Sequence, residues 1–144
     1  MNDLTLKARS VFADDRYATV ATGIEIDHVD NLQAVCGLTL GDTHRNAKGA
    51  VMGGVLFTLA DFAFAVAANS AEPSDNGDIN LCWVSSTSTI NFLNPVKGER
   101  LVAKTECIKK GKTQTVYKID IADNTGVMVA TVITTGLRVH QQHA

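Results

Sequence analysis

One stretch of 21 residues, GAVMGGVLFTLADFAFAVAAN at Gly49–Asn69, carries a single charged side chain, that of Asp61. Alanine and leucine dominate its second half, which favours a helix over a strand, and we expect this helix from about Gly53 to Asn69. Apolar side chains fall on every face of such a helix, so it must be enclosed rather than lie on a surface. The rest of the chain has to fold around it.

A membrane span is the main alternative for this segment, because its length is close to the ~20 residues that a span needs. Asp61 near its centre would cost roughly 2.5–3.5 kcal/mol on insertion. The 144 residues are 45% hydrophobic and 19% charged, which is typical of a globular protein and fits one domain over residues 1–144. We therefore expect a core helix and no membrane association.

The remaining segments predict strands and one short helix. Residues 32–40 alternate apolar with other side chains, a period of two that indicates a strand, and another strand is expected before it. A fold class of α+β follows, with a curved antiparallel sheet wrapped around one long central helix and the last four strands forming a meander. The helix is expected at Asp3–Phe12 and the last strands at Trp83–Leu93, Leu101–Ile108, Gln114–Ala122 and Val127–Val139, the odd-numbered residues of the last sharing one face.

Charge and cysteine content narrow the choice of ligand and compartment. The net charge of −2 gives no reason to expect nucleic acid, but residues 1–94 have 5 basic against 11 acidic side chains, and residues 95–144 have 8 against 4. That asymmetry suggests an anionic ligand near the C-terminal half. Three cysteines without a C-x-x-C pair, and no apolar leader at the N-terminus, favour a cytoplasmic protein.

Asp61 has a structural and a chemical interpretation. It can pair with a cation, cap a neighbouring element or face a water-filled crevice. It can also act as a nucleophile or general base. Gly53 and Gly54 begin the helix, where backbone N–H groups lack intrahelical acceptors and can stabilise an oxyanion, although two glycines can equally serve only a tight turn.

The spacing of Gly53 and Asp61 bears on whether they act together. Eight residues of helix separate them by roughly 12 Å along the axis, so one carbonyl cannot contact both. If both serve one reaction, they must come from two copies of the chain. A second copy would also cover the helix face that a single sheet leaves open, so we expect a homodimer.

The loop and helix start resemble a known family signature. Asn46, Gly49, Gly53, Gly54 and the Leu59–Asp61 triplet are similar to N-x-x-G-x-x-H-G-G…L-A-D of hotdog-fold acyl-CoA thioesterases, specifically the phenylacetate-degradation (PaaI-type) branch. The resemblance extends over about residues 32–139, including the four closing strands. It implies a hotdog domain that hydrolyses acyl-CoA to a free acid and coenzyme A, as a dimer or dimer of dimers, with no metal and no cofactor beyond the substrate's own coenzyme A.

The same resemblance implies roles for individual residues. Asp61 would be the nucleophile or the base that activates water, the Gly53 N–H would polarise the thioester carbonyl, and Asn46 would hold the thioester or the water. Met52 and Gly54, beside Gly53, would contact the substrate. Further coenzyme A contacts are expected at Asn94 and Pro95, which line the pantetheine arm, and at the basic turn Lys109, Lys110, Gly111 and Lys112, which attracts phosphates although such a turn is often merely solvated.

One position departs from the family pattern. Met52 stands where the family has histidine, and a thioether neither donates a hydrogen bond nor titrates near neutral pH. Two other functions therefore stay open: an acyl-CoA-binding or regulatory protein without turnover, and a purely structural interaction domain. His28, His44, His140 and His143 have no comparable context and are expected at the surface.

Overall fold

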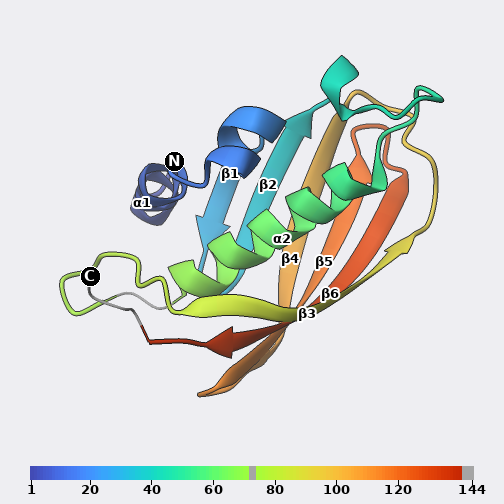
Figure 1. Cartoon of the computed structure of the whole chain (residues 1–144). Helices are drawn as coiled ribbons and strands as arrows, with labels where there is room; N and C mark the ends of the chain where they lie inside the picture. The colour runs from blue at the N-terminus through green and yellow to red at the C-terminus, as the bar shows by residue number, and fades with distance from the viewer. Residues whose placement is uncertain (72–73, 141–144) are drawn as a thin grey trace.

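The computed structural model describes residues 1–71 and 74–140 (Figure 1). Six antiparallel strands form one curved sheet that wraps around a long helix, which confirms the predicted fold class. The predicted short N-terminal helix and the long core helix are both present. The elements are α1 (Asp3–Phe12), β1 (Glu25–Asp30), β2 (Gln33–Thr39), α2 (Gly53–Ser70), β3 (Trp83–Phe92), β4 (Arg100–Lys110), β5 (Gln114–Asp123) and β6 (Met128–Arg138).

Helix α2 supplies much of the hydrophobic core. Eleven of its side chains are buried, and Phe64 meets Tyr117 of β5 edge to face, with ring centroids 5.6 Å apart. Its length and hydropathy would allow it to cross a membrane, but 61% of it is buried inside the protein, as in a core helix. A narrow stripe stays exposed along α2 at Gly54, Phe57 and Asp61. The helix is thus enclosed on most sides and open on one.

The sheet order corrects the predicted four-strand meander. The strands lie in the order β1-β2-β4-β5-β6-β3, so β3 pairs with β6 at an edge while β4 lies in the middle beside β2 (Figure 1). The segment from 93 to 99 therefore has to cross the ends of β6 and β5. Asp123 anchors this crossing, because its Oδ2 accepts hydrogen bonds from the backbone N–H groups of Lys97 at 2.8 Å and Gly98 at 3.0 Å.

A bulge divides the odd-numbered residues of β6 that were predicted to share one face, because Val129 before it is buried. Ala130, Val132 and Thr134 point into the core, whereas Ile133 and Leu137 are about two-fifths exposed. The pairing of β5 with β6 skips one residue of β6, and such a bulge exchanges the two faces of a strand. Small side chains beyond the bulge suit the close approach of α2: a Cβ on Gly136 would lie 2.6 Å from the ring of Phe64.

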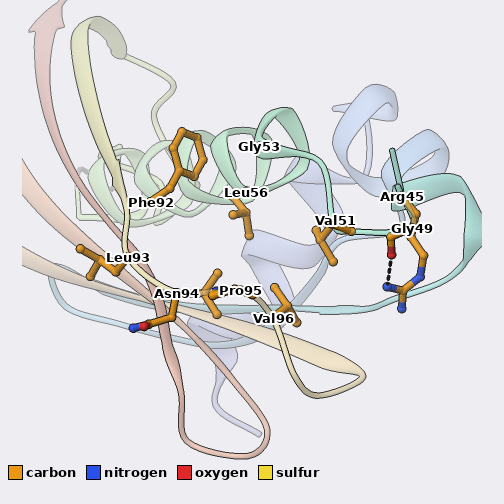
Figure 2. A pocket seen from close by; sticks show the side chains of 12 residues that line it. Arg45, Gly49, Val51, Gly53, Leu56, Phe92, Leu93, Asn94, Pro95 and Val96 are labelled. Atoms are coloured by element: carbon orange, nitrogen blue, oxygen red, sulfur yellow. Dashed lines mark hydrogen bonds between the residues drawn. The ribbon is translucent and has the colours of Figure 1, made fainter. Parts of the chain in front are cut away.

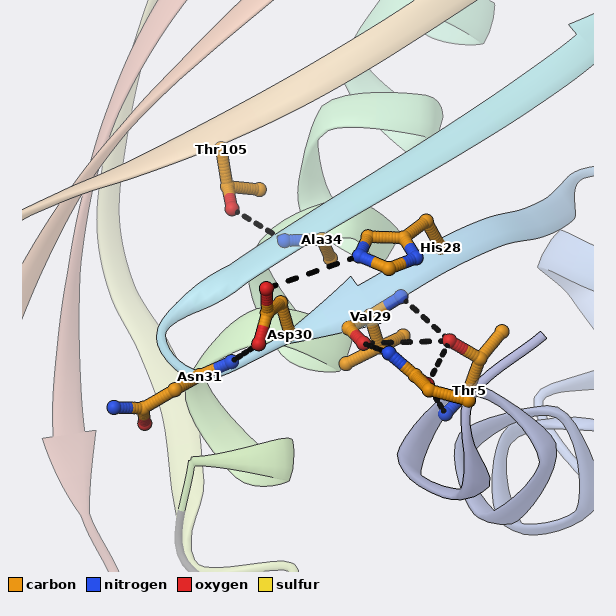
Figure 3. A network of polar contacts seen from close by, with 8 residues as sticks. Thr5, His28, Val29, Asp30, Asn31, Ala34 and Thr105 are labelled. Atoms are coloured by element: carbon orange, nitrogen blue, oxygen red, sulfur yellow. Dashed lines mark hydrogen bonds and ion pairs between the residues drawn. The ribbon is translucent and has the colours of Figure 1, made fainter.

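Helix α1 packs beside β1 and is fixed there by polar contacts (Figure 3). The Thr5 hydroxyl accepts a hydrogen bond from the backbone N–H of Val29 at 2.9 Å, and the Asn2 side chain donates to the Val29 carbonyl at 2.9 Å. Phe12, at the end of α1, meets Phe62 of α2 edge to face. These contacts place the following segment, Asp15–Thr22, against the middle of α2.

Candidate active site

A cavity of about 550 Å³ lies at the N-terminal end of α2 (Figure 2). Gly53 lies on its α2 side, and Asn94 and Pro95 of the crossing segment line its other side, so three residues expected to bind substrate share one space. The Asn94 side chain donates to the Met128 carbonyl at 2.9 Å, which fixes the loop against β6. Apolar side chains such as Leu56 make up most of the wall, as is usual for a small-molecule pocket.

The start of α2 presents an open backbone donor to this cavity. The helix has no side-chain cap, because Met52 occupies the capping position, and the Gly53 N–H has no acceptor among the described residues. A Cβ on Gly53 would lie only 3.0 Å from the ring of Phe92 on β3. Any larger residue would make the ring or the helix start shift by a few tenths of an ångström. An oxyanion at this point would meet an unpaired N–H and the positive end of the helix dipole.

Asn46 organises the loop that leads into α2. Its side-chain oxygen accepts hydrogen bonds from the backbone N–H groups of Lys48 at 3.0 Å and Ala50 at 3.1 Å, and its own backbone N–H donates to the Ala50 carbonyl. Its side-chain nitrogen makes no hydrogen bond within residues 1–71 and 74–140. The oxygen is thus occupied by the loop, and the amide N–H₂ is the part that can reach a ligand.

Asp61 lies in a different hollow, of about 300 Å³, on the open stripe of α2. Its carboxylate is exposed and accepts a hydrogen bond from the Ser85 hydroxyl of β3 at 3.2 Å. Asp61 is therefore exposed to solvent and hydrogen-bonded, so its carboxylate does not carry the cost of an isolated charge in an apolar core. Tyr17 and Phe62 give the hollow its aromatic walls, while Gly53 does not line it.

A second carboxylate stands near Asp61. Asp15, in the segment after α1, lines the same hollow. Partial burial, followed by the negative charges of Asp14 and Asp61, raises the pKa of Asp15 above its ordinary value. Asp15 thus places a second carboxyl group in the same hollow as Asp61, and Arg16 lies at its edge.

Met52 and Gly54 do not line the Gly53 cavity. They face a third hollow, of about 200 Å³, together with Tyr17 and His44. His44 is 8% exposed, so the prediction that it lies at the surface is wrong. Its Nδ1 accepts a hydrogen bond from the Gly41 N–H at 2.9 Å, and its Nε2 lies 2.7 Å from the Thr22 carbonyl, so both ring nitrogens already serve the backbone.

The basic residues at the β4–β5 hairpin lie far from the Gly53 cavity of their own chain. All four residues from Lys109 to Lys112 were predicted in the turn, but Lys109 and Lys110 belong to β4, so this prediction is wrong for them. Gly111 and Lys112 lie in the connection. The Lys110 ammonium is 3.4 Å from the carbonyl of Ala71, which caps the C-terminal end of α2. The whole helix, roughly 27 Å for its 18 residues, therefore separates this hairpin from Gly53.

Comparison with known proteins identifies the fold family. The sequence profile of the family described as "Thioesterase superfamily" matches residues 48–130, more than half of the chain. The chain belongs to the thioesterase superfamily. It is 36% identical over 124 residues to the acyl-coenzyme A thioesterase PaaI of Escherichia coli K12, which covers 85% of this chain and 82% of the relative. The resemblance to the PaaI-type branch is thereby confirmed.

Solved structures of superfamily members agree. The E. coli PaaI protein superposes with a TM-score of 0.81 at 30% identity, covering 96% of this chain and 97% of that one. A hypothetical thioesterase from Streptococcus pneumoniae TIGR4, solved with coenzyme A, gives a TM-score of 0.77 at 24% identity, over 92% of this chain and 99% of that one. The second likeness shows the hotdog fold alone.

Three residues near the candidate site of this superfamily member escaped prediction from the sequence. Ser85 sits in the run SSTST, where nothing singles out one hydroxyl, and Asp15 is far from Asp61 along the chain. Arg45 lines the Gly53 cavity and directly precedes Asn46, so its place beside the family signature was the available signal. Within the described residues, no group of three or more histidine, cysteine, aspartate or glutamate side chains could hold a metal ion.

Proposed function

We propose that this chain is a PaaI-type acyl-CoA thioesterase whose active site forms between two subunits. Membership of the superfamily and the 36% identity to E. coli PaaI support the reaction: hydrolysis of an acyl or aryl-acyl thioester to a free acid and coenzyme A. The observation that carries the composite site is the separation of its parts. Gly53 and Asp61 of one chain open into two different cavities. We assign one half of the chemistry to each cavity.

The mechanism assigns one step to each half. The Gly53 N–H donates to the thioester oxygen and stabilises the oxyanion as the tetrahedral intermediate forms. Asp61 of the partner subunit attacks the carbonyl carbon or removes a proton from the attacking water. Ser85 orients that carboxylate through its hydroxyl, and the amide of Asn46 holds the thioester or the water. Collapse of the intermediate expels the coenzyme A thiolate, which is protonated on release. Where water attacked, the free acid forms directly; where Asp61 attacked, a water then hydrolyses the Asp61–acyl anhydride, which releases the acid and restores the carboxylate.

The exposed parts of the chain suit a twofold dimer. Most side chains of the edge strand β3 are exposed, and an unpaired edge is a template for a second strand. Phe57 is 37% exposed and lies four residues from both Gly53 and Asp61. A twofold axis near Phe57 with antiparallel α2 helices would therefore bring Gly53 of each subunit to Asp61 of the other. We propose a homodimer, paired further as a dimer of dimers, acting in the cytoplasm without a membrane, nucleic acid, metal or added cofactor.

A thiol-release screen over short, long and aryl acyl-CoAs tests the activity. We expect at least one substrate to release coenzyme A, and Asp61→Asn to lower that rate by about 10²–10⁴-fold without changing the circular dichroism spectrum or the oligomeric state. Saturable acyl-CoA binding without Asp61-dependent release of coenzyme A would favour a non-catalytic binding protein. Met52 in place of the family's histidine is the reason to consider that alternative. If the protein neither binds acyl-CoA nor releases coenzyme A from it, a purely structural interaction domain is the remaining alternative.

A further inference from the structure

The Gly53 cavity has one charged side chain in its wall. Of the twelve residues that line it, only Arg45 is ionised, and the others are apolar, glycine or Asn94. Figure 2 shows Arg45 at one end of the cavity, with Val51 between it and the start of α2. A ligand that fills this space with an uncharged arm and extends past Val51 would meet a single cation.

The guanidinium of Arg45 is held in place but not neutralised. Its Nη1 donates to the Gly49 carbonyl at 3.1 Å across the loop that Asn46 organises (Figure 2). It forms no ion pair with any carboxylate among residues 1–71 and 74–140. A guanidinium has five N–H donors in a planar fork, so most of them remain for an anion that reaches the loop. The tether reduces the side-chain freedom that such binding would cost.

The lysines of the β4–β5 hairpin cannot take this role within the same chain. They lie at the C-terminal end of α2, a helix length away from Gly53. An arm that starts at Gly53 and passes Val51 approaches the loop at 45–49. Of the two cations in that loop, Arg45 lines the cavity and Lys48 does not.

We propose that Arg45 anchors a phosphate of the coenzyme A moiety from the same chain that supplies Gly53. This inference rests on the proposed function, since it takes the thioester carbonyl to lie at Gly53. The uncharged pantetheine arm occupies the apolar cavity, and Arg45 binds phosphate oxygens at its end by charge-assisted hydrogen bonds. Gly53 and Arg45 then form one side of the composite site, which binds the carrier, while the Asp61 hollow of the partner faces the acyl group.

Binding of free coenzyme A to the Asp61→Asn protein tests this without hydrolysis. Titration calorimetry compares coenzyme A with pantetheine, which lacks the phosphates. We expect Arg45→Ala to weaken coenzyme A binding about tenfold and pantetheine binding by less than about twofold, with an intermediate loss for Arg45→Lys. The difference in coenzyme A affinity between the proteins with and without the Arg45→Ala substitution should become smaller as the salt concentration increases, because salt screens the charges. Lys48→Ala is the matched control, because it removes a charge from the same loop outside the cavity wall.

Several results would overturn the assignment. These are unchanged coenzyme A binding in Arg45→Ala, equal losses for coenzyme A and pantetheine, or a loss in Lys48→Ala as large as that in Arg45→Ala. A second experiment on the active protein compares acyl-CoA with the matched acyl-pantetheine, and we expect Arg45→Ala to raise KM only for the first. If Arg45→Ala hydrolyses acyl-CoA with an unchanged KM, the assignment of Arg45 is wrong, but the proposed thioesterase activity is not affected. If coenzyme A binding depends on Arg45 but neither wild type nor any variant hydrolyses acyl-CoA, the proposed thioesterase activity is wrong. The role of Arg45 in binding phosphate would then still hold.

Discussion

The start of α2 and its middle differ in almost every physical respect. The Gly53 cavity is mostly apolar, bounded by a loop that Asn46 braces and by a crossing segment that Asp123 anchors. The Asp61 hollow is about half as large, carries two carboxylates and opens on the exposed stripe of the helix. In the proposed reaction, the first region would hold a neutral chain and polarise a carbonyl, and the second would supply a negative charge. One helix thus carries two unlike halves that its own length keeps apart.

The largest effect in the Gly53 half is expected from Gly53→Ala. The new methyl would meet the Phe92 ring at 3.0 Å, so the ring or the helix start must shift by a few tenths of an ångström. Because a misplacement near 1 Å can cost about a hundredfold, we expect kcat/KM to fall about ten- to thirtyfold. Steady-state thiol release measures this. Gly54→Ala is the matched comparison, because its Cβ meets nothing within 4 Å, and we expect a much smaller loss. Equal losses in both would show that the Phe92 contact is irrelevant.

A smaller effect is expected in the Asp61 half from Ser85→Ala. Without the hydroxyl, Asp61 keeps its charge but loses its only hydrogen bond within the described part of the chain, so kcat should fall about five- to tenfold with KM nearly unchanged. Ser85→Thr should restore part of the rate. Ser86→Ala is the control, because the Ser86 hydroxyl donates to the Thr135 carbonyl instead. A change confined to KM would assign Ser85 to binding rather than to the carboxylate.

The smallest effect on turnover is expected from Asp123→Asn, which loosens the wall of the Gly53 cavity. The Thr125 hydroxyl and the backbone N–H groups of Lys97, Gly98 and Thr125 hold the pKa of Asp123 well below its usual range. Its stabilising effect is therefore complete above the ordinary carboxyl pKa of about 3.9 and is lost as the pH falls below it.

Thermal unfolding across a pH series checks this. We expect Asp123→Asn to have a lower Tm than wild type at pH 7 and a smaller further decrease between pH 5 and pH 3. An identical acid-side decrease in the two proteins would mean that another carboxylate dominates.

Sequence patterns were sufficient for the features with local causes. The composition of Gly49–Asn69 predicted α2, and the period of two predicted strands such as β2 and β5, because burial of one face imposes that period. The place of β3 beside β6 depends on pairing across the whole chain, and the change of face within β6 depends on one bulge. Neither leaves a local signature.

The candidate site divides in the same way. Gly53 and Asp61 stand out because a glycine pair and a lone carboxylate are unusual in an apolar helix, and helix geometry alone separates them. Ser85 and Asp15 are ordinary residues in polar surroundings, and only the fold brings them to Asp61. Arg45 becomes a candidate binding residue only because the fold places it in the wall of the cavity that the crossing segment also lines. The superfamily signature supplied roles for the first pair and none for the others.

Complementation between two impaired variants tests the composite site most directly. Gly53→Ala and Asp61→Asn proteins are unfolded together, refolded as a mixture and assayed for thiol release beside each variant refolded alone. A site that takes Gly53 from one subunit and Asp61 from the other predicts one intact site in each mixed dimer, and thus about one quarter of wild-type activity after random pairing. Activity no higher than the average of the two variants refolded alone would contradict the account, because both residues would then serve a site within one chain.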